Sequence, residues 1–138
     1  MKEVHAYLNF DGNCRQAMTF YQGCLGAELQ LTPFHDANGQ PSTDPGARIM
    51  HSQLTVRGAA ILMASDTHAG GTLQHGNDFS MSIQCESVEE IERLFAALGE
   101  GGEVKMPLAD MFWGARFGML TDRFGIQWML NCFLKSPQ

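Results

Sequence analysis

The sequence contains one succession of elements twice, and this internal repeat is the feature that most restricts how the chain can fold. The first copy has a strand pattern, a helical pattern and a second short strand pattern, at residues 4–10, 13–25 and 28–31. The second copy has the same three patterns, at residues 79–85, 88–98 and 103–106. Each copy then ends in a predicted hairpin, formed by residues 50–56 with 59–65 and by residues 115–121 with 126–131. The repeat therefore predicts a βαβββ unit used twice.

A single βαβββ unit has one helix, which covers only one face of its sheet, so two such units are expected to associate. The 138 residues, of which 44% are hydrophobic, suffice for one domain and leave little core for two independent ones. We therefore predict an α+β fold with a single domain, residues 1–138, that contains module one at about 1–67 and module two at about 77–133.

Charge and composition exclude several classes of partner. The net charge of −6 provides no basic surface for nucleic acid. The N-terminal residues lack the apolar stretch of a secretion signal, and no segment approaches the ~20 apolar residues of a membrane helix. We therefore expect a cytoplasmic protein without nucleic-acid or membrane partners. The four cysteines fall inside predicted helices and strands, so we expect reduced thiols in the core: Cys14, Cys24, Cys85 and Cys132.

Local signals predict how the helices begin and where the loops lie. Asn13 stands where the first helix should have its N-cap. Ser87 and Glu90 have the spacing of a capping box at the start of the second helix. Residues 34–47 are rich in Asp, Asn, Gly and Pro and predict a loop of the length that often has a function in a small domain.

The chain resembles the vicinal oxygen chelate superfamily, which includes glyoxalase I, bleomycin-resistance proteins, fosfomycin-resistance transferases and extradiol dioxygenases. The segments that support this resemblance are DGN at 11–13, AMTFY at 17–21, CLG at 24–26 and DRFG at 122–125. Two further segments, LMASD at 62–66 and WGARFG at 113–118, are similar to the PhnB-like branch. The match extends over essentially the whole chain. It implies two βαβββ modules whose curved mixed sheets form a cleft.

In the enzymes of this superfamily, the first and last strands of each module hold a divalent metal. The corresponding positions in this chain are His5, Met63, Ser80 and Met129. A catalytic Zn, Mn or Fe site needs about three nitrogen or oxygen ligands, and a thioether is a poor substitute. We therefore predict that the protein has no metal or other cofactor. If a metal is bound, His5 is the expected ligand and His51 is a weak second candidate.

Counting across the first hairpin gives a prediction for His51. If Arg57-Gly58 forms a two-residue turn, Ser52 pairs with Met63 and shares its face. His51 then pairs with Ala64 and faces away from Met63, under the helix.

The same counting in the second hairpin concerns Arg116. If residues 122–125 form a four-residue loop, Gly118 pairs with Met129 and Arg116 pairs with Asn131. Arg116 would then point into the cleft, where a buried guanidinium needs an anionic partner. A structural ion pair with Asp110 or Asp122 is the alternative.

These considerations give a candidate site for a small, anionic organic ligand. We expect the ligand to contact a set of residues from both modules: His5, Tyr7, Met63, Ser80, Trp113, Arg116 and Met129. His5 lies on an otherwise apolar strand and is equally compatible with a hydrogen-bonded core histidine. A stripe of methionines is likewise compatible with ordinary core packing.

Three hypotheses about function follow. The first is a metal-free binding or sequestration protein, as the resemblance to bleomycin-resistance proteins implies. The second is a metal-dependent lyase, isomerase or oxygenase that uses His5. The third is an interaction module with a vestigial cleft. PhnB-like sequences have been labelled as ubiquinone-pathway methyltransferases, but no doubly wound sheet pattern that would hold a methyl donor is present, so we predict no such activity. We also expect a homodimer.

Overall fold

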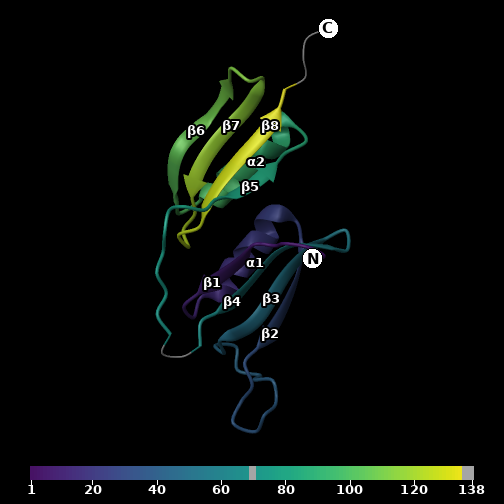
Figure 1. The fold of residues 1–138 in the computed structure, drawn as a ribbon, viewed down its shortest axis with the longest axis vertical. Helices are drawn as coiled ribbons and strands as arrows, with labels where there is room; N and C mark the ends of the chain where they lie inside the picture. The colour runs from purple at the N-terminus through teal and green to yellow at the C-terminus, as the bar shows by residue number, and fades with distance from the viewer. Residues whose placement is uncertain (69–70, 135–138) are drawn as a thin grey trace. The chain divides into compact units, whose positions relative to one another are not determined.

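The computed structural model describes residues 1–68 and 71–134 and contains the predicted repeat. The first unit, Met1–Gln74, comprises β1 (Tyr7–Phe10), α1 (Cys14–Leu25), β2 (Glu28–Pro33), β3 (Ile49–Val56) and β4 (Ala59–Asp66). The second unit, His75–Gln138, comprises β5 (Met81–Gln84), α2 (Val88–Gly99), β6 (Glu103–Met111), β7 (Ala115–Thr121) and β8 (Gln127–Phe133). Figure 1 shows the ten elements. The boundary between the units lies in the connection that was expected between the modules.

Each unit folds around one four-stranded mixed sheet. The strand orders are β1-β4-β3-β2 and β5-β8-β7-β6, so the first strand of each unit pairs with the last. These first pairs, β1 with β4 and β5 with β8, are parallel, and the remaining pairs are antiparallel. The α+β fold of two βαβββ modules is therefore confirmed, and the cleft between the sheets stays a prediction.

Each helix packs on one face of the sheet of its own unit. Helix α1 buries Ala17, Met18 and Tyr21, and α2 buries Ile91, Leu94 and Leu98. Complete burial of an apolar side chain of this size contributes about 1.5–3 kcal/mol, so these helix–sheet contacts are the main stabilising layer of each unit. We call the sheet surface opposite the helix the open face. Among the described residues, no helix is long and apolar enough to cross a membrane.

The four cysteines are buried and form no disulfide, as predicted. Burial raises the pKa of the Cys14 thiol to about 11 and that of the Cys85 thiol to about 11. Both side chains therefore act as small apolar groups of the core, since a thiolate is the reactive form and is disfavoured there.

The predicted register of the first hairpin is wrong by one residue. Val56 does pair with Ala59 across the Arg57-Gly58 turn, but a bulge between Leu54 and Thr55 shifts the strand beyond it. Ser52 therefore pairs with Ala64, and both are fully buried on the helix side. His51 lies on the open face instead of under the helix, because neighbouring strand residues point to opposite faces.

The register of the second hairpin is wrong by one residue as well. The backbone N–H of Asp122 donates to the carbonyl of Ile126 at 2.8 Å, so the loop includes Ile126 and Thr121 pairs with Gln127. Arg116 then pairs with Cys132, which is buried on the helix side. A difference of one residue in loop length reverses the face of every side chain beyond it.

Candidate functional site

The open face of the first sheet has one continuous row of side chains across all four strands. Tyr7 pairs with Met63, Met63 with Gln53, and Gln53 with Gln30. The Tyr7 hydroxyl lies 2.9 Å from Nδ1 of His51, and their rings are 5.7 Å apart. The structure thus brings two of the sequence-predicted residues, Tyr7 and Met63, onto one face, and it adds His51 to them.

His5 and Ser80 both precede the strands to which they were assigned. His5 is exposed, and its Nε2 lies 2.5 Å from Oε2 of Glu3. Ser80 is exposed just before β5. Over residues 1–68 and 71–134, no group of three or more His, Cys, Asp and Glu side chains is arranged to hold a metal ion. One imidazole, one hydroxyl and two thioethers do not fit a site of this type.

The open face of the second sheet combines an aromatic wall with two amides. Trp113, in the turn between β6 and β7, contacts Phe117 edge to face, with ring centroids 5.7 Å apart. The indole N–H of Trp113 donates to Oδ1 of Asn131 at 3.5 Å, and Nδ2 of Asn131 donates to Oε1 of Gln84 at 3.0 Å. These contacts form a chain of polar groups that begins at the half-exposed indole and crosses β8 to β5.

An apolar floor lies beside this series of hydrogen-bonded polar groups. Met129 pairs with Met119 on one side and with Ser82 on the other, and both methionines are half-buried. Methionine side chains are flexible and polarisable, so a floor of this kind adapts to ligands of different shape. The polar chain and the floor together define what we call the second-sheet surface: Trp113, Phe117, Met119, Met129, Asn131 and Gln84.

Arg116 does not belong to the second-sheet surface. Its Nη1 donates to Glu92 of α2 at 2.6 Å, and its Nε donates to Asp110 of β6 at 2.8 Å. The hydrogen bond to Asp110 raises the pKa of Arg116 above its usual value. The prediction that Arg116 points to the Met129 face is therefore wrong, and the alternative of a structural ion pair with Asp110 is confirmed. The other candidate acid, Asp122, accepts a hydrogen bond from the Trp128 indole instead.

Sequence reasoning missed four residues of this surface: Phe117, Met119, Asn131 and Gln84. A usable signal existed for Asn131, since it stands two positions after Met129 and strand alternation places both on one face. Phe117 and Met119 depend on the register of the second hairpin, which differs by one residue from the prediction, and Gln84 is placed by the parallel pairing of β5 with β8.

A family model described as 3-demethylubiquinone-9 3-methyltransferase matches residues 2–131. The chain belongs to this family. Over 142 residues it is 31% identical to the protein YjdN of Escherichia coli K12, with 95% of each chain covered. The crystal structure of protein PA1353 from Pseudomonas aeruginosa is 43% identical, with a TM-score of 0.80 and coverage of 96% of this chain and 100% of that one.

A second solved structure relates the chain to the PhnB-like branch. The PhnB protein of Bacillus cereus is 26% identical, with a TM-score of 0.77 and coverage of 95% of this chain and 99% of that one. A glyoxalase/bleomycin resistance protein/dioxygenase family enzyme from Burkholderia phytofirmans shares the fold, at 14% identity and a TM-score of 0.63, with 93% and 97% of the two chains covered. The predicted resemblance to PhnB-like proteins is confirmed, and the chain shares the fold of the glyoxalase/bleomycin resistance protein/dioxygenase family.

Proposed function

We propose that this protein binds a small organic molecule on the second-sheet surface, without a resident metal. The observation that supports this proposal most directly is the Trp113–Asn131–Gln84 chain of hydrogen bonds beside Phe117 and Met129. Small-molecule sites are mostly apolar, with aromatic walls and a few polar groups that fix orientation. A half-exposed indole next to amide groups has this composition.

The corrected position of Arg116 changes the expected chemistry of the ligand. A negative charge on the ligand was predicted because Arg116 was expected on this face, and the guanidinium is in fact satisfied by two carboxylates on the other side. The second-sheet surface offers neutral amide donors and acceptors instead. We therefore propose a ligand with a flat apolar body that stacks on Trp113 and an oxygen or N–H group that exchanges hydrogen bonds with Asn131 and Gln84. Binding by His5, Tyr7, Met63 and Ser80 stays a prediction.

The experiment is a thermal-shift screen of aryl amides and aryl carboxylates, followed by titration of the hits. Trp113→Ala and Asn131→Ala should each weaken a hit about tenfold or more, since each removes a stacking or hydrogen-bonding partner. Phe79→Ala is the matched control, because Phe79 is an exposed aromatic residue outside this surface. Arg116→Met should leave the affinity within about twofold. Hits that survive both Trp113→Ala and Asn131→Ala would contradict the proposal.

The metal-dependent alternative is favoured by one observation, the shift in register that places His51 on the open face together with Tyr7. Two imidazoles still fall short of the three ligands of a catalytic site. The measurement that separates the hypotheses is the metal content of protein purified without an affinity tag. We expect His5→Ala to leave that content almost unchanged. About one Zn, Mn or Fe per chain that His5→Ala removes would establish the alternative.

Methyl transfer is the activity that the description of the family names. We propose that this chain does not perform it, because its two four-stranded mixed sheets differ from the doubly wound sheet that would hold a methyl donor. The sequence pattern predicts no such sheet either. Titration with S-adenosylmethionine in a calorimeter tests this point, with no heat of binding expected.

We further propose that the protein forms a homodimer, since symmetric dimers are the commonest oligomers. Light scattering at low micromolar concentration should give about twice the 15.2 kDa mass of one chain. A mass of one chain would contradict the proposal.

A further inference from the structure

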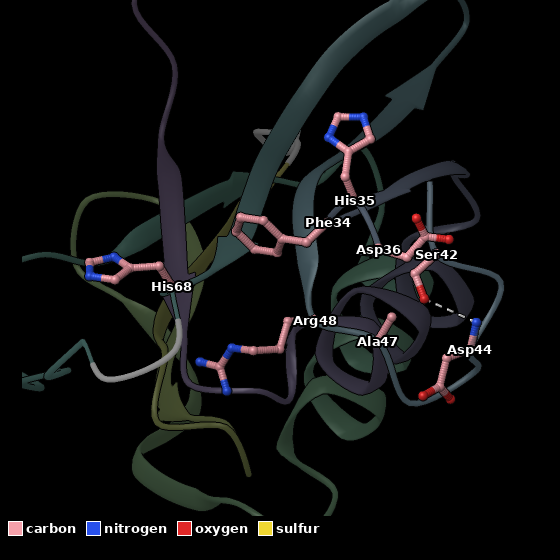
Figure 2. Close-up of a pocket in the computed structure, with 8 residues that line it drawn as sticks. All are labelled: Phe34, His35, Asp36, Ser42, Asp44, Ala47, Arg48 and His68. Carbon is pink, nitrogen blue, oxygen red and sulfur yellow. Dashed lines mark hydrogen bonds between the residues drawn. The ribbon is translucent and has the colours of Figure 1, made fainter. Parts of the chain in front are cut away.

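The pocket in the first unit does not gather its charged groups around one point. It has a volume of about 330 Å³ and lies where the loop between β2 and β3 meets the end of β4. Figure 2 shows the Asp36 and Asp44 side chains pointing apart, and each accepts backbone N–H groups of its own loop. Arg48 donates to Thr67 and Asp11. These charges order the loop, and the pair of reactive side chains that the fold brings together lies in the second unit instead.

Two cysteines of the second unit occupy neighbouring positions on adjacent strands. β5 and β8 are parallel, and Gln84 pairs with Asn131. The next residue along each strand direction is a cysteine, Cys85 or Cys132. The backbone ladder continues to them, because the Cys85 N–H donates to the Asn131 carbonyl at 2.7 Å. The pairing therefore sets Cys85 beside Cys132, although the two are distant in sequence.

Both thiols lie on the helix side of the sheet. The side chains of Gln84 and Asn131 meet on the open face, where Nδ2 of Asn131 donates to Oε1 of Gln84, so the residues that follow them point to the opposite face. Cys85 is 9% exposed and Cys132 is 2% exposed. Adjacent strands lie about 4.7–4.9 Å apart, and the Cα atoms of disulfide-bonded residues usually lie about 4.4–6.8 Å apart. The strand spacing therefore suits a bond between these two sulfur atoms.

The two cysteines of the first unit are not placed for such a bond. Cys14 and Cys24 both belong to α1. Each residue of a helix advances about 1.5 Å, so these two lie about 15 Å apart along the helix axis. A disulfide requires Cα atoms within about 7 Å of each other. Within the units, the fold therefore permits the pair Cys85–Cys132 and not the pair Cys14–Cys24.

We propose that Cys85 and Cys132 are a site of reversible oxidation, at which hydrogen peroxide produces a disulfide. Cys85, the more exposed of the two, attacks the peroxide as a thiolate and becomes a sulfenic acid, and the first water leaves. The Cys132 sulfur then attacks the sulfenic sulfur, the S–S bond forms, and the hydroxyl group leaves as the second water. Two thiols thus lose two electrons and two protons, and one peroxide molecule is reduced to two water molecules.

The environment makes this reaction slow near neutral pH and gives the bond a structural effect. Burial, the Glu90 carboxylate and the neighbouring Cys132 raise the pKa of the Cys85 thiol to about 11, so little thiolate is present at neutral pH. The bond fastens β5, an edge strand of four residues, to β8. β5 also contains Gln84, so the disulfide fixes one amide of the second-sheet surface. Its formation does not depend on a ligand there, because both sulfur atoms lie on the helix side.

The test compares peroxide oxidation of the folded protein with oxidation of the chain in urea, at about pH 8, where more thiolate is present than at neutral pH. After free thiols are blocked with iodoacetamide, trypsin places the four cysteines on four different peptides, so mass spectrometry identifies each bridge. We expect Cys85–Cys132 as the main disulfide of the folded protein. In urea, closure of the shorter loop is favoured, so we expect Cys14–Cys24 instead. A folded protein without the Cys85–Cys132 bridge would overturn the proposal, and so would the same bridge as the main product in urea.

Thermal unfolding gives a second readout. The bridge closes a long loop of the unfolded chain, so the oxidised protein should melt about 5–10 °C higher than the reduced one, and dithiothreitol should reverse the shift. Cys132→Ala should abolish the shift and leave Cys85 as a sulfenic acid that dimedone traps. Cys24→Ala is the matched control, since it removes a buried cysteine of the first unit and should retain the shift. A shift that survives Cys132→Ala, or an oxidised protein that melts below the reduced one, would contradict a bond that fits the native strands.

Discussion

The two modules have the same elements in the same order, but the buried aspartate of each module has different hydrogen-bond partners. Asp66 and Asp122 are both 4% exposed. Asp122 accepts hydrogen bonds from Phe124, Ile126 and the Trp128 indole, all within six residues of itself. The carboxylate closes its own hairpin.

Asp66 instead joins the end of its own strand to two distant segments of the first module. Its Oδ1 accepts the N–H groups of Gly12 at 2.8 Å and Cys14 at 3.0 Å, and its Oδ2 accepts the N–H of Ile49 at 2.8 Å. Cys14 lies 52 residues away in the sequence and begins α1. A carboxylate at a helix N-terminus satisfies free N–H groups and interacts favourably with the helix dipole.

The helices differ in the same way. In α2, the Ser87 hydroxyl accepts the Glu90 N–H at 3.1 Å, and the Glu90 carboxylate accepts the Glu86 N–H at 2.9 Å. The Ser87 cap is as predicted, and the Glu90 carboxylate bonds the N–H of the residue before the N-cap in place of the N-cap N–H of a capping box. In α1, Asn13 forms no side-chain cap, contrary to prediction, and Asp66 accepts the N–H groups of Gly12 and Cys14 on either side of it. The first module is thus closed by long-range contacts and the second by local ones.

The largest expected effect comes from removing the long-range acceptor. Asp66→Ala leaves three buried or part-buried N–H groups without a partner, so it should lower the free energy of unfolding by about 4 kcal/mol. Urea denaturation measures this loss. A loss below about 1 kcal/mol would mean that water replaces the carboxylate and that the contrast between the modules is superficial.

A second contrast lies in β3 and β7, at the positions that pair with Ala64 and Leu130, respectively. Ser52 occupies the first, and its hydroxyl donates to the Ala64 carbonyl at 2.7 Å. Gly118 occupies the second, where a Cβ would lie 2.7 Å from Cε2 of Phe95. Gly118→Ala should therefore destabilise by about 2 kcal/mol through overpacking, and Ser52→Ala by about 1 kcal/mol. Chemical denaturation that shows the reverse order would contradict this packing account.

The two helix starts give a smaller, paired effect. Ser87→Ala should cost about 1 kcal/mol, the usual value of an N-cap, whereas Asn13→Ala should cost close to zero. The same denaturation experiment compares them. An equal loss for both variants would show that Asn13 caps α1 in solution.

The last effect is absent near neutral pH and arises only at alkaline pH, where the modules should behave alike. Burial raises the pKa of the Cys14 and Cys85 thiols to about 11, above the ordinary value of 9.0. Below pH 9 both states hold the protons, and from about pH 9 to 11 the unfolded state loses them first, so stability falls as pH rises. Cys14→Ala and Cys85→Ala should each flatten this fall when stability is measured between pH 8 and pH 11 in about one-unit steps. Variants with the slope of the original chain would show that the thiols do not contribute.

The sequence by itself determined the elements that depend on neighbouring residues. Helical periodicity located α1 and α2, and the Ser87–Glu90 spacing predicted a cap that is confirmed. Arg57-Gly58 predicted a two-residue turn, and both residues have positive φ, 52° and 80°. Each of these features involves residues at most a few positions apart, so a short window of sequence contains the whole interaction.

Only the tertiary structure decided which face each strand residue occupies. The bulge at Leu54/Thr55 and the inclusion of Ile126 in its loop each moved a register by one residue. His51 thereby came to the open face and Arg116 left it, which removed the predicted anion anchor. At the start of α1, Asp66 accepts the Cys14 N–H, and Asn13 forms no side-chain cap. The physical reason is common to all three. The backbone N–H groups of the strands and of the start of α1 find their acceptors in residues distant in sequence, so the most stable arrangement of the whole sheet determines the pairing.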